Sequence, residues 1–174
     1  MSVATEPVRS SISTEAAGLL FHDAHTAYAF TGEPVTDAEM NTAYDLMVKA
    51  PSAMNSQPLR VTVLRSEAAS TPVVIIRAAD TDFHELLPRL LPQATDAKDM
   101  FNATLQAGYF IIAARARGLD AGPMGGFDRD GVNAEFFAGT AMKAILAGNL
   151  GHAAEGGTFP RNPRLGYGQA VTTI

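Results

Sequence analysis

The sequence predicts an α+β fold, with helices and a few short strands in separate stretches of the chain. Three observations support this prediction. Capped stretches with helical apolar spacing at 36–50 and 96–117 are typical of helices. Short β-branched runs at 60–64 and 72–76 are typical of strands. The length of 174 residues corresponds to about one domain.

The composition excludes several classes of protein. The chain has 13 basic and 18 acidic residues, and it lacks the Lys/Arg cluster expected of a nucleic-acid binder. It contains no cysteine, which excludes disulfides, thiol nucleophiles and cysteine-ligated metal centres. No apolar run approaches the roughly 18 residues of a membrane span. We therefore expect a soluble, cytoplasmic protein with a flexible N-terminus over residues 1–12 and one domain over 13–174.

The first half of the chain contains two capped helical stretches. A serine or threonine at the start of 13–28 can cap a first helix. Thr36 and Glu39 have the spacing of a capping box for a second helix over 36–50. Pro51 ends it, because proline disfavours helical backbone in the residue before it. The apolar stripe of this second helix comprises Met40, Ala43, Tyr44 and Met47.

The strands and the C-terminal part are less regular. The run at 72–76 is apolar on both faces, which favours a central strand, and 60–64 is expected to be a second strand. A leucine-rich stretch at 86–91 suggests a short helix, and 144–150 suggests a further strand. Residues 160–174 are expected to be irregular or extended.

The longest helical pattern runs over 96–117 and ends before Gly118, which suits the left-handed position after a helix. Asp128 can cap a further helix that runs through Phe137. The expected buried stripe of the long helix comprises Phe101, Leu105, Tyr109, Ile112 and Ala113.

Three stretches have residue types suited to ligand binding, although each also has a purely structural interpretation. The loop 51–58 contains prolines, serines, Asn and Gln, which either contact a ligand or satisfy their own backbone. The glycines of 122–128 either admit a flat or anionic ligand or form a turn. Arg161 and Arg164 either hold a phosphate or belong to a solvated tail. The four histidines lack metal-ligand spacing, so no metal site is expected.

In this order, the three stretches resemble those of the FMN-dependent nitroreductase family, with its P-S-x-x-N loop, its Gly-rich loop ending in G-F-D and its C-terminal basic residues. The resemblance is closer to the branch that contains malonic semialdehyde reductase. Four stretches carry this closer likeness, at 20–26, 34–37, 82–88 and 118–129.

The resemblance implies a nitroreductase-like α+β fold, with a central, mostly antiparallel sheet flanked by helices, and an intertwined homodimer with FMN at the subunit interface. One subunit would supply the P-S-x-x-N loop to the flavin and the other the Gly-rich loop. The residues that would bind the cofactor are His25, Thr26, Pro51, Ser52, Asn55, Gln57, Pro123, Met124, Gly125, Gly126, Arg161 and Arg164.

The activity implied by the resemblance is that of an NAD(P)H oxidoreductase. NADH or NADPH would give hydride to flavin N5, and the flavin would pass it to a small acceptor. That acceptor would be malonic semialdehyde, reduced to 3-hydroxypropionate, or a nitro or quinone compound. Because the flavin carries the chemistry, no catalytic side chain is expected. The alternative is a non-catalytic protein that binds flavin or another small ligand on the same fold.

The sequence departs from the family pattern in three places. His25 stands where the branch has a phosphate-binding arginine, and a histidine is shorter and often neutral at pH 7. Gly125 stands where members have a serine or an acidic residue. The chain is also short near Ser70, where the family has a further flavin-contacting segment, and just before Met100.

Overall fold

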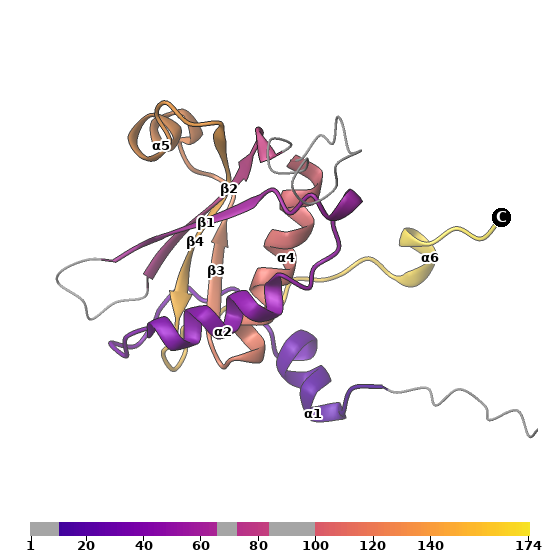
Figure 1. The fold of residues 1–174 in the computed structure, drawn as a ribbon. Helices are drawn as coiled ribbons and strands as arrows, with labels where there is room; N and C mark the ends of the chain where they lie inside the picture. The colour runs from indigo at the N-terminus through magenta and orange to yellow at the C-terminus, as the bar shows by residue number, and fades with distance from the viewer. Residues whose placement is uncertain (1–10, 66–72, 84–99) are drawn as a thin grey trace, which may run out of the picture.

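The structure of the protein is a computed structural model that describes residues 11–65, 73–83 and 100–174. Its four strands form one antiparallel sheet in the order β1-β2-β4-β3 (Figure 1). The expected α+β fold with a sheet flanked by helices is therefore confirmed. The strands are β1 (Leu59–Leu64), β2 (Val73–Asp80), β3 (Asp120–Met124) and β4 (Met142–Gly151).

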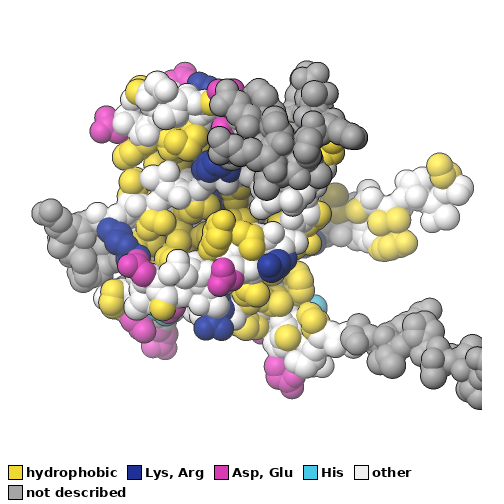
Figure 2. Space-filling view, viewed as in Figure 1, with side chains coloured by type: hydrophobic (Ala, Val, Ile, Leu, Met, Phe, Trp, Pro, Cys, Tyr) yellow, Lys and Arg dark blue, Asp and Glu magenta, His cyan; other side chains and the backbone are white. Residues whose placement is uncertain are grey.

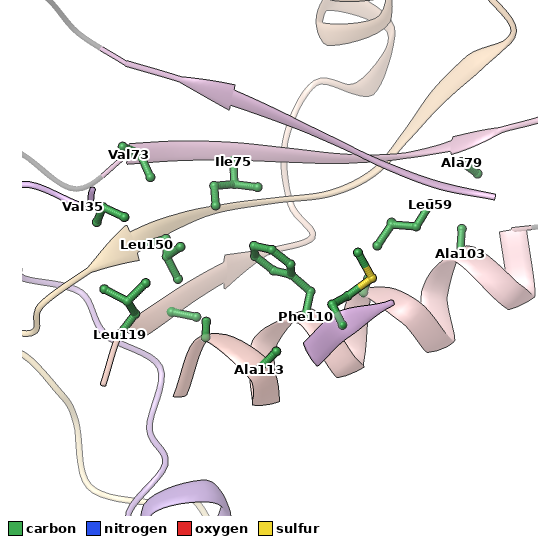
Figure 3. Close-up of a cluster of buried hydrophobic side chains, with 14 residues drawn as sticks. Val35, Leu59, Val73, Ile75, Ala79, Ala103, Phe110, Ala113, Leu119 and Leu150 are labelled. Carbon is green, nitrogen blue, oxygen red and sulfur yellow. The ribbon is translucent and has the colours of Figure 1, made fainter. Parts of the chain in front are cut away.

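The helices cover both faces of this sheet. Alternate residues of β2 point to opposite faces, and Ile75 belongs to the core under α2 and α4, whereas Ile76 belongs to the core under α5. In Figure 3, Phe110 lies between α4 and the strands that carry Ile75 and Leu150. The helices are α1 (Thr14–Ala17), which continues as a π-helical turn (Gly18–His22), α2 (Asp37–Met47), α4 (Met100–Ala116), α5 (Arg129–Phe136) and α6 (Tyr167–Ala170).

The predicted capping box at the start of α2 is confirmed. The Glu39 backbone N–H donates to the Thr36 hydroxyl at 3.2 Å, and the Thr36 backbone N–H donates to the Glu39 carboxylate at 2.8 Å. The Thr36 backbone N–H and the Thr36 hydroxyl both donate to the Glu39 carboxylate, and they hold the pKa of Glu39 below its ordinary value. A lowered carboxyl pKa contributes stability that is present above the unfolded-state pKa and is lost as the pH falls through the folded-state pKa. The cap therefore weakens only in acid.

The first helix is shorter than expected and ends at His22 rather than near Tyr28. The chain is extended after it, because the Ala27 backbone N–H donates to the Ala121 carbonyl at 3.1 Å. The Tyr28 backbone N–H donates to the Gly157 carbonyl at 2.8 Å. Tertiary backbone pairing thus replaces the last helical turns, and it fixes the N-terminal segment 23–28 beside β3.

The buried stripe predicted for the long helix is wrong in all but one position. Of the predicted residues only Ala113 is buried, and Phe101 is 72% exposed. The core face of α4 uses smaller residues around one large side chain, Phe110. The outer face carries the large side chains Phe101, Leu105, Tyr109 and Ile112, all of which are exposed.

A strand also replaces the first half of the expected Gly-rich loop. Residues 120–124 form β3, which pairs with β4 through registers such as Gly122 with Asn149. Pro123 is tolerated there because β3 is an edge strand, where a missing backbone N–H breaks no pairing on the open side. The glycines that remain in a loop are Gly125 and Gly126.

Some sequence predictions lie outside the described residues. These are the N-terminal residues 1–10, the helix expected at 86–91 and the segments beside Ser70 and before Met100. Within the described ranges, no helix has the length and hydropathy needed to cross a membrane. Likewise, among the residues that the structure describes, no three His, Cys, Asp or Glu side chains are grouped as metal ligands.

Candidate functional site

A cleft of about 270 Å³ lies where the N-terminal segment 23–28, β3, α4 and the segment 159–164 meet. It collects five of the residues that the sequence predicted to bind a cofactor: His25, Thr26, Pro123, Arg161 and Arg164. It also contains residues that the sequence interpretation missed, among them Tyr28, Ile111, Arg115, Phe159 and Asn162. We call it the polar cleft.

A glycine on β3 brings the walls of the polar cleft together. A Cβ at Gly122 would lie 2.4 Å from the Ala27 carbonyl oxygen, so only glycine allows the N-terminal segment to approach this closely. The segment is held from the other side by Phe159, whose carbonyl oxygen lies 3.0 Å from His25 Nδ1. The cleft is therefore built from parts of the chain that are far apart in sequence.

The polar cleft has a cationic end formed by Arg161 and Arg164. Arg161 Nη2 donates to the carbonyls of His22 at 2.8 Å and Ala24 at 2.6 Å. Arg164 Nη1 donates to the Asn162 carbonyl at 2.7 Å. Within the part of the chain that is described, neither arginine forms an ion pair with a carboxylate. Both are exposed, so their positive charges are available to an anion.

Arg115 also lines the polar cleft, but its charge is already matched. Its guanidinium forms an ion pair with Asp120, and its Nε donates to the Leu19 carbonyl at 3.0 Å. Asp120 in turn accepts from the Ala153 backbone N–H at 3.1 Å. Arg115 therefore ties α4, β3 and the first helix together and forms a wall of the cleft.

A second cleft of about 220 Å³ lies between α4 and β4, and it shares Ile111 with the polar cleft. Its lining is mainly apolar, so we call it the apolar cleft. The end of β3 runs beside its β4 wall, because Met124 pairs with Ala147. The two clefts together suit an elongated ligand with an anionic end and an apolar end. The apolar cleft is lined by Thr104, Ala107, Gly108, Ile111, Ile145 and Leu146.

Gly125 and Gly126 directly follow the end of β3. The packing of the described residues does not require glycine at either position. A Cβ built on either residue would meet no atom of the described part of the chain within 4 Å, and neither has a positive φ. Open space at both positions leaves room for a ligand to approach the backbone.

The loop 51–58 lies at the opposite end of α4, where the Ala53 backbone N–H donates to Asn102 at 2.8 Å. Asn102 and Arg115 are 13 positions apart on this helix, which at 1.5 Å per residue is about 20 Å. The loop is therefore far from the polar cleft within one chain, and none of its predicted site residues lines the polar or the apolar cleft. These predicted residues are Pro51, Ser52, Asn55 and Gln57.

Three residues of this loop have left-handed backbone conformations: Met54 (φ 53°), Asn55 (φ 57°) and Gln57 (φ 45°). Such a conformation costs roughly 1–2 kcal/mol at a residue with a Cβ, and asparagine tolerates it best. Two side-chain hydrogen bonds support the loop, from the Gln57 backbone N–H to Ser52 Oγ at 3.2 Å and from Gln57 Nε2 to Asn55 Oδ1 at 2.9 Å. Strain concentrated in this way is typical of ligand-contact segments. Sequence alone does not reveal it, because methionine and glutamine have no preference for this conformation.

Comparison with known proteins gives the family. The nitroreductase family model matches residues 23–102. A protein of Streptomyces griseus named NADH dehydrogenase/NAD(P)H nitroreductase is 41% identical, over 90% of this chain and 94% of its own length. A protein of the same name from Caulobacter sp. (strain K31) is 38% identical, over 95% of this chain and all of its own length.

Solved structures share the fold at low sequence identity. The nitroreductase YdfN of Bacillus subtilis has a TM-score of 0.81 and 17% identity, and the match covers 93% of this chain and all of that one. A nitroreductase of Exiguobacterium sibiricum in complex with FMN has a TM-score of 0.79 and 16% identity, with 95% and 100% coverage. The family expected from the sequence is confirmed. None of these relatives is named as a malonic semialdehyde reductase, so the closer resemblance to that branch is not confirmed. The fold, the match to the family model and the identity to these relatives show that the chain belongs to the nitroreductase family.

Proposed function

We propose that the protein is an FMN-dependent NAD(P)H oxidoreductase. The observation that carries this proposal is the pair of adjoining clefts, one ending in the exposed charges of Arg161 and Arg164 and the other apolar. FMN has the matching two ends, a phosphate dianion and a flat ring system. The FMN complex of the Exiguobacterium relative supports the choice of flavin.

The residues present fit this cofactor. Arg161 and Arg164 would hold the phosphate by charge-assisted hydrogen bonds, with Thr26 beside them in the same cleft. Gly125 and Gly126 would let their backbone approach the ring edge, where a side chain would intrude. When bound, FMN supplies hydride transfer between NADH or NADPH and an acceptor. The chain itself binds and orients the reactants and excludes water from the apolar cleft.

We infer that the working form is a homodimer, as the resemblance to the nitroreductase family implies. α4 is apolar on both of its long faces, and a helix of this kind is normally buried all round. One face is in the core, and the other presents Leu105 and Tyr109 to solvent. A second copy of the chain is the occupant that also completes the site, because it can bring its own loop 51–58 to the clefts.

The C-terminal segment 165–174, which contains α6, supports the same inference. It projects from the body of the molecule in Figure 1, and hydrophobic side chains lie on its surface in Figure 2. Leu165 and Tyr167 are each more than 70% exposed. Large apolar side chains on a projecting segment are typical of a chain that packs on a partner. In such a dimer, Pro51, Ser52, Asn55 and Gln57 of one subunit would contact the flavin held by the other.

For the acceptor we propose a small aldehyde, malonic semialdehyde, which would be reduced to 3-hydroxypropionate. The four sequence stretches that resemble the malonic semialdehyde reductase branch support this choice. Nitro compounds and quinones are the competing acceptors, because the relatives are named as nitroreductases.

The test uses the full-length protein. FMN binding is measured by quenching of flavin fluorescence, and oxidation of NADH and of NADPH is then followed with malonic semialdehyde, a quinone or a nitroaromatic compound. Stoichiometric flavin binding with acceptor-dependent oxidation is expected. No flavin binding at any FMN concentration would refute the proposal.

The competing function is a flavin- or small-ligand-binding protein without turnover. The histidine at position 25 and the short stretch near Ser70 favour it, because both remove a flavin contact that the family pattern has. Flavin binding with no oxidation of either nucleotide, whatever the acceptor, would establish this alternative.

Gly126→Val tests whether the open space beside β3 belongs to the cofactor. The free energy of unfolding should change by no more than about 0.5 kcal/mol, because a Cβ at this position meets no atom of the described residues within 4 Å. FMN affinity should fall at least about tenfold, since the valine would occupy the approach to the ring. Urea denaturation and fluorescence titration measure the two effects. Unchanged FMN affinity would contradict the placement of the ring.

Gly122→Ala is the matched control. Its Cβ would lie 2.4 Å from the Ala27 carbonyl oxygen, so this variant should lose about 1–3 kcal/mol of unfolding free energy even without flavin. The two glycine positions therefore separate a requirement of the fold from a requirement of the ligand.

A further inference from the structure

His25 occupies a distinctive position in the polar cleft. It lies on the N-terminal segment and lines the same cleft as Arg161 and Arg164. Its Nδ1 lies 3.0 Å from the carbonyl oxygen of Phe159. The side chain is half-buried and remains within reach of a ligand in the cleft.

The contact with Phe159 fixes the hydrogen-bonding role of the ring. A carbonyl oxygen only accepts hydrogen bonds, so Nδ1 must carry the proton. In the neutral ring Nε2 is then an acceptor, which opposes a phosphate oxygen. In the protonated ring Nε2 becomes a charged donor, which attracts it. One proton on the ring therefore decides whether His25 repels or attracts the phosphate.

We propose that His25 couples binding of the FMN phosphate to the uptake of one proton, so that the protein binds FMN more tightly as the pH falls toward 6.5. This inference rests on the proposed FMN-dependent function. An arginine at this position would hold the phosphate at any physiological pH. With His25 instead, the charge at the phosphate end depends on whether the ring carries its second proton.

The other charged groups around His25 do not produce the same effect. His22 and Asp23, on the same segment, are exposed and do not line the cleft. From α4 and β3, Arg115 and Asp120 face the cleft region as an ion pair. From the C-terminal side, Arg161 and Arg164 stay charged throughout this range.

The phosphate itself limits the effect at lower pH. Phosphate monoesters take up their second proton near pH 6, which lowers their charge and weakens their attraction to arginine. FMN affinity should therefore be greatest a little above pH 6 and should fall on both sides. Riboflavin has the same ring and no phosphate, so its affinity should not follow this profile.

The experiment compares FMN and riboflavin dissociation constants at pH 6.5 and pH 8.0 by fluorescence quenching. For the unaltered protein, FMN should bind about tenfold more tightly at pH 6.5, whereas riboflavin should show the same affinity at both. His25→Arg should bind FMN tightly at both pH values. His25→Gln, which keeps a hydrogen-bonding side chain without a titrating charge, should bind FMN weakly at both. His22→Gln is the control and should behave like the unaltered protein.

Calorimetry in two buffers of different ionisation enthalpy counts the protons directly. Near pH 7, FMN should bind with net uptake of up to one proton, and riboflavin with none. His25→Arg should abolish the uptake. This readout does not depend on turnover of the loaded enzyme.

The outcomes separate this inference from the proposed function. FMN binding that has the same pH profile in His25→Gln as in the unaltered protein would overturn the inference and leave the proposed function standing. Failure of the unaltered protein and of His25→Arg to bind FMN at either pH would overturn both.

Discussion

Leu105→Asp is expected to convert the proposed homodimer to a monomer and to remove FMN binding with it. Leu105 lies in the middle of the outer apolar face of α4. A carboxylate there would have to be buried without a partner when two copies meet, which costs several kcal/mol. That cost weakens association at least about a hundredfold. Size-exclusion chromatography with light scattering gives the mass, and flavin absorbance gives the bound cofactor.

Phe136→Asp is the matched control for this variant. Phe136 is a similarly exposed large side chain, but it lies on α5, which packs against the other face of the sheet. This variant should remain dimeric and should bind FMN. A monomeric Leu105→Asp that still bound FMN with full affinity would show that one chain holds the cofactor alone. It would remove the role proposed for the loop 51–58 of the partner.

Arg77→Met is expected to raise the free energy of unfolding by about 1–3 kcal/mol. Arg77 lies in the middle of β2, is 2% exposed, and has no carboxylate partner in the described ranges. Its Nη2 donates to the Ala147 carbonyl at 3.1 Å, and its guanidinium lies 5.9 Å from the centre of the Phe110 ring. Among the described residues its Nε has no hydrogen-bond partner. Replacing a buried charge by an apolar side chain of similar volume is often stabilising.

The size of this effect follows from the electrostatics. Burial lowers the pKa of Arg77 from its ordinary value to about 10. At 1.36 kcal/mol for each pH unit of that fall, burial of the charge costs about 3 kcal/mol, which the contacts to Ala147 and Phe110 partly offset. The cost is fully present below about pH 10 and is relieved only as the pH rises above it. The gain in Arg77→Met should therefore be constant between pH 6 and 9 in urea denaturation.

Arg60→Met is the control for the removal of an arginine from the same sheet. Arg60 Nη2 lies 2.6 Å from a carboxylate oxygen of Asp80, so this change leaves Asp80 without its partner. It should lower the unfolding free energy by about 1 kcal/mol. If Arg77→Met were also destabilising, burial of the Arg77 charge would not be a net cost to this fold.

The features that sequence predicted well are local ones. The capping box of Thr36 and Glu39 and the cap formed by Asp128 depend on residues three positions apart, so their geometry is set by the helix itself. The left-handed residue Gly118 after α4 is also local. The apolar run of β2 correctly indicated a central strand, because burial on both faces requires it.

The inner face of α4 could not be predicted, because the helix is apolar all round. Its large outer residues, such as Leu105 and Tyr109, have the spacing of a core stripe. The true inner face uses alanines around Phe110. Spacing identifies an apolar face, but it does not say whether that face packs on the same chain or on another.

The strand β3 and the backbone conformation of the loop 51–58 were not predicted, for a different reason. Gly122 and Pro123 have low strand propensity, and they form a strand only because β4 pairs with them. The left-handed backbone of Met54 likewise could not be predicted from the residue types around it. The composition of the candidate site could be predicted from short motifs, but its division between the two ends of α4 depends on tertiary structure.

The way the polar cleft is assembled has a consequence for folding kinetics. Its walls meet through contacts such as that between His25 and Phe159, which are 134 positions apart in sequence. Contacts of such separation form late, because the entropy of closing a long loop must be overcome first. A transition state that lacks the cleft has no place for a cofactor. FMN would therefore slow unfolding of the finished protein and leave its rate of folding unchanged.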